Sequence, residues 1–326
     1  MTVLVTGGAG YIGSHMVLAL LDRGERVVVI DNLSTGFRWA VPPAADLIVG
    51  DVADAACVRA ALADHAIDSI IHFAGSIIVP ESVANPLKYY ANNTAASRTL
   101  IEAAVGAGVQ CFIFSSTAAV YGNPETNPVA ETARLAPMSP YGSSKLMTET
   151  MLADVAAAHP LRYVALRYFN VAGADPLGRS GQSTPNATHL IKVACETALG
   201  KRMKMSVFGT DYPTADGTCI RDYIHVTDLA AAHLNALDHL RNGGASNIFN
   251  CGYSRGYSVR EVIDAVKRVC GVDFTVEEVA RRAGDPAAIV AASEKIRSVL
   301  GWTPKHDDLD RIVAQALAWE RALAER

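Results

Sequence analysis

The chain has no apolar run long enough to cross a bilayer, although half of its 326 residues are hydrophobic. Its first residues, MTVLVTGGAG, lack the basic start, the apolar run and the small-residue cleavage site of a signal peptide. No block of basic residues stands out, and the formal net charge is -4, which argues against nucleic acid as a partner. We therefore expect a cytoplasmic protein with no nucleic-acid partner and no membrane partner.

Cysteines are few and widely separated. No two of them are spaced by only two residues, so the sequence predicts neither a zinc ribbon nor a redox pair, and we expect no metal site. Isolated cysteines in a chain of this size suit a reducing compartment, where they pack as small apolar groups. The six are Cys57, Cys111, Cys195, Cys219, Cys251 and Cys270.

Short β-branched runs alternate with longer amphipathic runs through the first half of the chain. Apolar strands that alternate with helices pair in parallel and carry helices on both faces of the sheet. This pattern predicts an α/β protein with a Rossmann-type doubly wound parallel sheet. The expected strands are 2–7, 26–31, 46–51, 69–75, 111–116 and 162–169. The expected helices are 14–24, 53–65, 86–108 and 141–159.

The composition changes near Gly173. From there to about Thr218 the chain is rich in Gly, Pro, Ser and Thr, with one helix-like run at 189–202. A strand and a helix follow at 221–240, then a short strand at 247–252 and an amphipathic helix at 259–271. We expect a smaller α/β substrate domain, interleaved with the first. The predicted division is a cofactor-binding domain at 1–175 with a return segment at 221–253, and a substrate domain at 176–220 and 254–326.

A glycine-rich turn opens the first predicted helix. Gly7, Gly10 and Gly13 are spaced Gly-x-x-Gly-x-x-Gly, after a strand and at the start of a helix. Glycines there permit a tight turn and a close approach to a pyrophosphate, and the helix N-terminus supplies free N–H groups. The next strand ends in Asp31, close to the spacing at which a carboxylate bonds the adenosine ribose. Because a carboxylate repels a 2′-phosphate, the motif predicts NAD rather than NADP.

Three further features lie in or directly after the predicted strands. Asp51 is placed to reach the adenine side of the cofactor or to cap the following helix, and both interpretations can hold together. Phe73, Ala74 and Gly75 end a strand at the carboxyl edge of the sheet, where small residues let a dinucleotide pack closely. His72 lies within an apolar strand, and we interpret it as a core histidine with satisfied hydrogen bonds.

Tyr141 and Lys145 form a Tyr-x-x-x-Lys pair at the start of a long predicted helix. Residues four apart share one helix face, so both side chains can enter one cleft. A phenol titrates near 10, and a nearby ammonium and the positive nicotinamide ring of NAD⁺ both favour its ionised form. Lowering that pKa to neutrality takes about 4 kcal/mol. Ser115 and Thr117, at the end of the preceding strand, supply hydroxyls that can share the proton of a substrate alcohol.

Over essentially its whole length the chain resembles the extended short-chain dehydrogenase/reductase family and, more narrowly, the UDP-glucose 4-epimerases. The motifs that carry this resemblance include TGGAGYIGSH, SPYGSSK, LRYFNVAGA, RRAGD and the discriminating run DYPTADGTCIRDYIHV. The resemblance implies that Tyr141 is the catalytic base, Lys145 its cationic partner and Thr117 the helping hydroxyl. It also implies a transient 4-keto sugar, tightly bound NAD and a homodimer built from the helices that start near Pro86 and Tyr141.

The resemblance assigns the remaining site residues. Those implied to bind NAD are Gly7, Gly10, Tyr11, Ile12, Gly13, Asp31, Asn32, Asp51, Val52, Phe73, Ala74, Gly75, Asn92, Ser115, Tyr141, Lys145 and Tyr168. Those implied to bind the UDP-sugar are Thr117, Asn170, His189, Phe208, Arg221, Arg282 and Asp285. Two arginines suit a diphosphate, because guanidinium groups donate bidentate, permanently charged hydrogen bonds. Without the resemblance, a surface ion pair explains each arginine equally well.

Three positions depart from the family pattern. Ile77 stands where many relatives carry a lysine near the cofactor, and His189 stands where an asparagine often contacts the substrate. Ile289 occupies a position at which a small residue is linked to N-acetylated sugars and a tyrosine to their exclusion. Sugar preference therefore stays open between UDP-glucose/galactose, UDP-xylose/arabinose and UDP-N-acetylhexosamines. A net dehydratase or oxidoreductase is a further alternative, although SSTAAV lacks the carboxylate that a dehydratase needs.

Overall fold

The computed structural model describes residues 1–185, 187–282 and 285–325, and within them one large sheet organises the chain. Its order is β10-β6-β5-β4-β1-β2-β3, and every neighbouring pair is parallel. The direction of winding reverses between β1 and β4, which is where a doubly wound sheet binds its ligand. The strands are β1 (Thr2–Thr6), β2 (Arg26–Asp31), β3 (Asp46–Val49), β4 (Ser69–His72), β5 (Cys111–Thr117), β6 (Arg162–Tyr168) and β10 (Asn247–Cys251).

Helices cover both faces of this sheet, as the sequence predicts. Side chains alternate along each strand, so Ile113 of β5 packs in one core cluster while its neighbours Phe112 and Phe114 pack in another. One face carries α1 (Tyr11–Asp22) and α8 (Val226–Arg241). The other carries α2 (Ala55–Asp64), α5 (Ala96–Gly106) and α6 (Pro140–Ala158). The predicted doubly wound α/β fold is confirmed.

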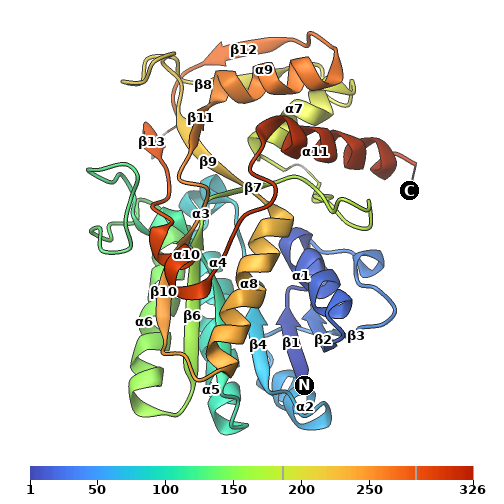
Figure 1. Cartoon of the computed structure of the whole chain (residues 1–326), viewed down its shortest axis with the longest axis vertical. Coiled ribbons are helices and arrows are strands. Elements are labelled where there is room, and N and C mark those ends of the chain that lie inside the picture. Colours follow the sequence, from blue (N-terminus) through green and yellow to red (C-terminus); the bar gives the residue numbers. More distant parts are fainter. Residues whose placement is uncertain (186, 283–284, 326) are drawn as a thin grey trace.

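A second region lies beyond the carboxyl edge of the sheet (Figure 1). Its helices α7 (Leu190–Ala198), α9 (Val259–Cys270) and α11 (Leu309–Leu323) pack against one another. Strand β8 (Met205–Phe208) pairs with β12 (Val276–Val279). Strand β9 (Ile220–His225) pairs with β7 (Asn170–Ala172), β11 (Gly256–Ser258) and β13 (Ala288–Ile289). Helix α10 (Glu294–Leu300) lies beside β10 and α8.

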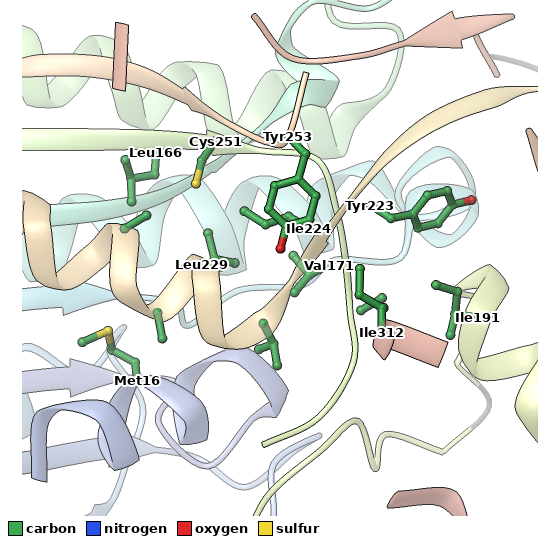
Figure 2. Packing of buried hydrophobic residues seen from close by; sticks show 14 of the residues in the cluster. Met16, Leu166, Val171, Ile191, Tyr223, Ile224, Leu229, Cys251, Tyr253 and Ile312 are labelled. Atoms are coloured by element: carbon green, nitrogen blue, oxygen red, sulfur yellow. The ribbon is translucent and has the colours of Figure 1, made fainter. Parts of the chain in front are cut away.

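One apolar cluster continues from the large sheet into the second region. Figure 2 shows Met16 of α1, Leu166 of β6 and Leu229 of α8 in the same packing as Ile191 of α7 and Ile312 of α11. The two regions therefore share a core, which fixes how substrate-side residues lie relative to the sheet. Strand β9 belongs to the smaller sheet and β10 to the larger one, and the domain division given above remains a prediction.

The helix predicted over residues 86–108 is interrupted in the structure. It comprises α4 (Pro86–Tyr89), a six-residue π-helix (Tyr90–Ala95) and α5. A short helix, α3 (Val79–Ala84), precedes it, and 3₁₀ turns lie at Arg38–Ala40 and Ala118–Val120. π-helices occur mostly as short insertions at functional sites, and this one places Asn93 against Ser144 of α6. Among the described residues, no helix is both long and apolar enough to span a bilayer.

Candidate active site

The glycine-rich turn is built as the spacing predicts. Gly7 adopts a left-handed backbone with φ of 71°, and a Cβ on it would lie 2.7 Å from the backbone nitrogen of Ala74. A Cβ on Gly13 would lie 2.1 Å from the carbonyl oxygen of Gly7. Side chains at these positions would fill the space above the turn, so glycine keeps the N-terminus of α1 close to the end of β4. Gly10 is the N-cap of α1 and provides no side-chain cap, which leaves the free N–H groups to a ligand.

Acidic residues surround this turn on its adenosine side. Asp31, which is buried, accepts hydrogen bonds from the backbone N–H of Ala9 at 2.9 Å and of Leu33 at 2.8 Å. Asn32 donates to Asp51 at 2.9 Å, so these two predicted cofactor residues lie side by side. The prediction that Asp51 caps α2 is wrong. Asp54 is the N-cap, because its carboxylate accepts from two backbone N–H groups of the first turn.

His72 is a core histidine, as predicted. Its Nδ1 lies 2.6 Å from the hydroxyl of Thr6 and its Nε2 lies 2.8 Å from the hydroxyl of Ser97. Burial lowers the pKa of His72 to about 3, so the ring is neutral. Just after it, Gly75 lies close to Lys145, since a Cβ on Gly75 would be 3.7 Å from the lysine nitrogen. The end of β4 therefore meets the start of α6 at the carboxyl edge of the sheet.

Helix α6 delivers the predicted base and its lysine to this edge. Ser139 caps the helix through a hydrogen bond to the N–H of Gly142, and Tyr141 and Lys145 follow on one face, 8 % and 3 % exposed. The Tyr141 phenol hydrogen-bonds Thr117 at the end of β5. Lys145 donates to the carbonyl oxygen of Ser115 at 2.9 Å. The structure therefore brings together all three residues that the sequence predicted to be catalytic.

A hydroxyl pair completes this end of β5. The side chain of Ser115 lies 2.5 Å from the phenol of Tyr168, which ends the neighbouring strand β6. Tyr11 of α1 donates to the carbonyl oxygen of Gly173 at 2.6 Å. That bond ties the glycine-rich turn to the chain that leaves β7. Three predicted cofactor residues, Ser115, Tyr168 and Tyr11, thus have structural partners as well.

Burial controls the electrostatics of the predicted catalytic group. Burial raises the pKa of Tyr141, and the hydrogen bond from Thr117 lowers it by a smaller amount. Burial also lowers the pKa of Lys145 to about 8, although its ammonium lies 4.9 Å from the centre of the Phe114 ring. In the chain by itself the pKa of Tyr141 is therefore shifted in the direction opposite to that predicted for the site with NAD⁺. A positive charge beside the phenol would have to overcome this desolvation.

Asn93, which the sequence patterns did not single out, supports the helix that carries the predicted base. Asn93, in the π-helix, donates to the hydroxyl of Ser144 at 3.0 Å and to the carbonyl oxygen of Ser76 at 3.0 Å. Its own oxygen accepts from the backbone N–H of Ser76 at 2.7 Å. The predicted cofactor residue Asn92 donates to the hydroxyl of Ser76 at 2.8 Å. Paired asparagines inside a helical pattern were the available signal, because asparagine is a weak helix former.

Apart from Thr117 at the end of β5, the predicted UDP-sugar residues fall into three groups in the second region. Asn170 and His189 line one cavity with Gly173, Gln182 and Tyr223, and Gln182 holds the His189 ring at 2.8 Å. Phe208 lies under Arg282, whose guanidinium carbon is 3.6 Å from the ring centre. Arg221 faces Asp285 across 3.7 Å and also donates to the carbonyl oxygen of Pro286. Two residues of the RRAGD motif, 283 and 284, lie outside the described residues.

The departures from the family pattern differ in their surroundings. Ile77 is 48 % exposed, in the loop between β4 and α3. Ile289 is buried on β13, directly opposite Arg221 of β9, and belongs to a small apolar cluster with Ala118 and Phe169. Because Ala118 follows Thr117, this cluster connects the end of β5 to the second region. A bulkier residue at position 289 would have to displace part of that cluster.

Chemically, the arrangement can move a proton to or from an alcohol. A phenol and a threonine hydroxyl share a hydrogen bond at the sheet edge, with a buried lysine one helical turn away. The glycine-rich turn beside it has the shape and the free N–H groups to hold a dinucleotide pyrophosphate.

Comparison with known proteins agrees with this geometry. Residues 3–252 match the NAD dependent epimerase/dehydratase family. A UDP-glucose 4-epimerase from Azospirillum brasilense is 59 % identical over 99 % of this chain and 93 % of its own length. The crystal structure of a Brucella ovis UDP-glucose 4-epimerase in complex with NAD superposes with a TM-score of 0.94 at 45 % identity, covering 97 % of both chains. The UDP-Glc/GlcNAc 4-epimerase of Campylobacter jejuni is 50 % identical, with a TM-score of 0.86, over 98 % of this chain and 99 % of the other.

Proposed function

We propose, from the premise that this chain belongs to the NAD dependent epimerase/dehydratase family, that it is a cytoplasmic enzyme that interconverts UDP-glucose and UDP-galactose by inverting carbon 4. The observation that carries the proposal is the grouping of Tyr141, Thr117 and Lys145 at the sheet edge beside a dinucleotide turn. All six cysteines are free thiols, which fits a reducing compartment.

NAD is the cofactor, and the residues present fit it. Gly7, Gly10 and Gly13 leave the space that a pyrophosphate needs, and Asp31 and Asn32 stand on the adenosine side. Lys145, Ser115 and Tyr168 lie at the nicotinamide end of the sheet edge. When bound, NAD supplies a hydride acceptor and donor in one turnover, so the net redox change is zero.

The chain's own residues handle the proton. Tyr141 removes the proton from the sugar 4-hydroxyl, and Thr117 holds the phenol through their shared hydrogen bond. The hydroxyl of Thr117 then bridges the phenol and the sugar oxygen. Lys145, one helical turn after Tyr141 on α6, is fixed by the carbonyl oxygen of Ser115. After the 4-keto sugar has turned its other face, the same phenol returns the proton.

Turning the sugar requires that the substrate be anchored elsewhere. Arg221 and Arg282 bind the diphosphate, Asp285 accepts from the uridine ribose, and Phe208 offers a ring face to uracil. Asn170 and His189 contact the sugar end from the cavity that they share. Binding energy therefore rests on the non-reacting nucleotide, which leaves the sugar free to rotate.

The direct test is to incubate the purified chain with UDP-galactose, without added cofactor, and to measure UDP-glucose. We expect conversion to a fixed equilibrium mixture, with no accumulation of free NADH. Formation of NADH in proportion to added NAD would instead identify a net dehydrogenase. Absence of any reaction with UDP-galactose, in a folded chain that retains NAD, would overturn the proposal.

A 4-epimerase with a wider range of sugars is the second candidate. The buried isoleucine at position 289 is smaller than the tyrosine that excludes N-acetylated sugars in the family, and the Campylobacter jejuni relative is named for both sugars. Steady-state kcat/KM values for UDP-galactose, UDP-N-acetylgalactosamine and UDP-arabinose decide between the candidates. Ile289→Tyr should lower the N-acetylated rate selectively if this side chain borders the sugar pocket.

The chain is further proposed to form a homodimer through α4, α5 and α6. Helices α4 and α6 pack together, and Leu87 of α4 and Met147 of α6 are 77 % and 45 % exposed, so the pair of helices offers apolar side chains to a second copy of the chain. Analytical ultracentrifugation should give twice the monomer mass, and Leu87→Lys with Met147→Lys should give the monomer. Met203→Lys, on a residue 96 % exposed between α7 and β8, is the control that should stay dimeric.

A further inference from the structure

A buried ion pair lies directly beneath the catalytic group, and the proposed mechanism makes no use of it. Glu149 of α6 and Arg167 of β6 are 3 % and 2 % exposed. The guanidinium Nε donates to one carboxylate oxygen at 2.9 Å, and Nη2 donates to the other at 2.5 Å. This is a bidentate contact, which fixes orientation as well as distance.

The acid is in register with the catalytic residues. Tyr141, Lys145 and Glu149 are spaced by four residues and lie along one face of α6. Lys145 and Glu149 contact two consecutive residues of β5, because Lys145 donates to the Ser115 carbonyl and Glu149 accepts from the Ser116 hydroxyl. The helix is therefore attached to the strand at two successive turns.

The arginine holds the other end of the same segment. Arg167 pairs with Ser116 across β5 and β6, and it donates to the phenol of Tyr121 at 3.0 Å. Its guanidinium also lies over the Tyr121 ring, 5.0 Å from the centre. The Tyr121 phenol donates in turn to Asn250 of β10 at 2.6 Å. Thr117 lies between Ser116 and Tyr121, so the catalytic threonine is bracketed by two contacts to one ion pair.

We propose that Glu149 and Arg167 are positioning residues that lock α6 against the 116–121 segment, and so align the Tyr141 phenol with Thr117. The inference rests on the proposed function, since alignment is read through epimerase turnover. Replacing a buried ion pair by well-packed apolar residues is often neutral for stability, so a need for stability alone does not explain the pair. A bidentate contact at one register, by contrast, penalises any slide or rotation of α6.

The test replaces both partners together, as Glu149→Leu with Arg167→Met, and measures kcat and KM for UDP-galactose. We expect a folded chain that retains NAD, with KM unchanged, because the nucleotide anchor lies in the second region. The kcat should fall about 100-fold, the order expected for a misplacement of about 1 Å in catalytic geometry. Arg167→Lys keeps the positive charge but loses the bidentate contact. Its kcat should lie between those of wild type and the double variant. A folded double variant with unchanged kcat would refute the positioning role.

Two further measurements keep the test decisive. If the double variant does not fold, Ser116→Ala with Tyr121→Phe removes the two side-chain hydrogen bonds between the ion pair and the segment, and leaves the ion pair intact. The same loss of kcat at constant KM is expected, and wild-type kcat there would overturn the proposal. Arg268→Gln with Asp310→Asn removes an exposed ion pair between α9 and α11, and is the control that should leave kcat unchanged.

Titration of the Tyr141 phenol separates this inference from the proposed function. Ultraviolet difference spectra against Tyr141→Phe follow the phenol without turnover. In the double variant the bond from Thr117 should weaken, so the pKa of Tyr141 should rise above its wild-type value. An unchanged pKa of Tyr141 in the double variant would contradict the positioning role, whether or not the chain converts UDP-galactose. Failure of the wild-type chain to convert UDP-galactose would by itself contradict only the epimerase assignment.

Discussion

Replacing Lys145 with methionine should abolish turnover and, at neutral pH, remove a stability penalty. Burial lowers the pKa of this ammonium from 10.5 to about 8. At about 1.4 kcal/mol for each pKa unit, holding the charge in the folded chain costs about 3 kcal/mol. The penalty is fully present below the folded pKa of about 8, and it disappears as pH rises to 10.5, because the unfolded chain binds more protons within that window.

The change in stability can be isolated from other effects of the substitution. Methionine leaves the carbonyl oxygen of Ser115 without its donor, which costs about 1–3 kcal/mol at every pH. Urea unfolding of cofactor-free protein therefore has to be compared at both ends of the window. The free energy of unfolding of the variant minus that of wild type should decrease by about 3 kcal/mol from about pH 7 to about pH 10.5.

An exposed lysine gives the matched control. Lys204→Met removes a surface ammonium that pairs with Glu277, so its stability difference from wild type should stay nearly flat over the same range. If the Lys145→Met difference were also flat, water would reach the ammonium, and the lowering of the Lys145 pKa by burial would be refuted.

Two further predictions concern the base and the cofactor turn. Tyr141→Phe should lower kcat at least about 100-fold and leave UDP binding by calorimetry unchanged, and near-normal turnover would remove Tyr141 as the base. In Gly13→Ala the new Cβ would lie 2.1 Å from the carbonyl oxygen of Gly7, so the backbone at Gly7 has to move. We expect the chain to be destabilised by about 1–3 kcal/mol and to lose its retained NAD. Gly106→Ala meets nothing within 4 Å in helix α5, so it should be neutral or stabilising by up to about 1 kcal/mol in the same thermal-melt series.

Much of the second region was beyond the reach of sequence patterns. Strands β7, β11 and β13 are two or three residues long, and so carry no measurable alternation. Helix α11 has a clear amphipathic pattern at Leu309–Leu323 and could have been found from it. The π-helix inside the predicted 86–108 helix was not foreseeable, because a one-residue widening leaves the apolar periodicity nearly intact.

The sequence by itself determined the doubly wound sheet, the dinucleotide turn and the shared helix face of Tyr141 and Lys145, because these depend on local spacing. Strand and helix periods set the sheet, glycines set the turn, and a separation of four residues places Tyr141 and Lys145 on one helix face. Only the tertiary structure decided the partners of these groups, such as Thr117 for the phenol and Asn93 for the catalytic helix. It also revealed the ion pair of Glu149 with Arg167. Contacts between residues far apart in the chain depend on how the helices pack and on the exclusion of water, and no short-range pattern encodes either.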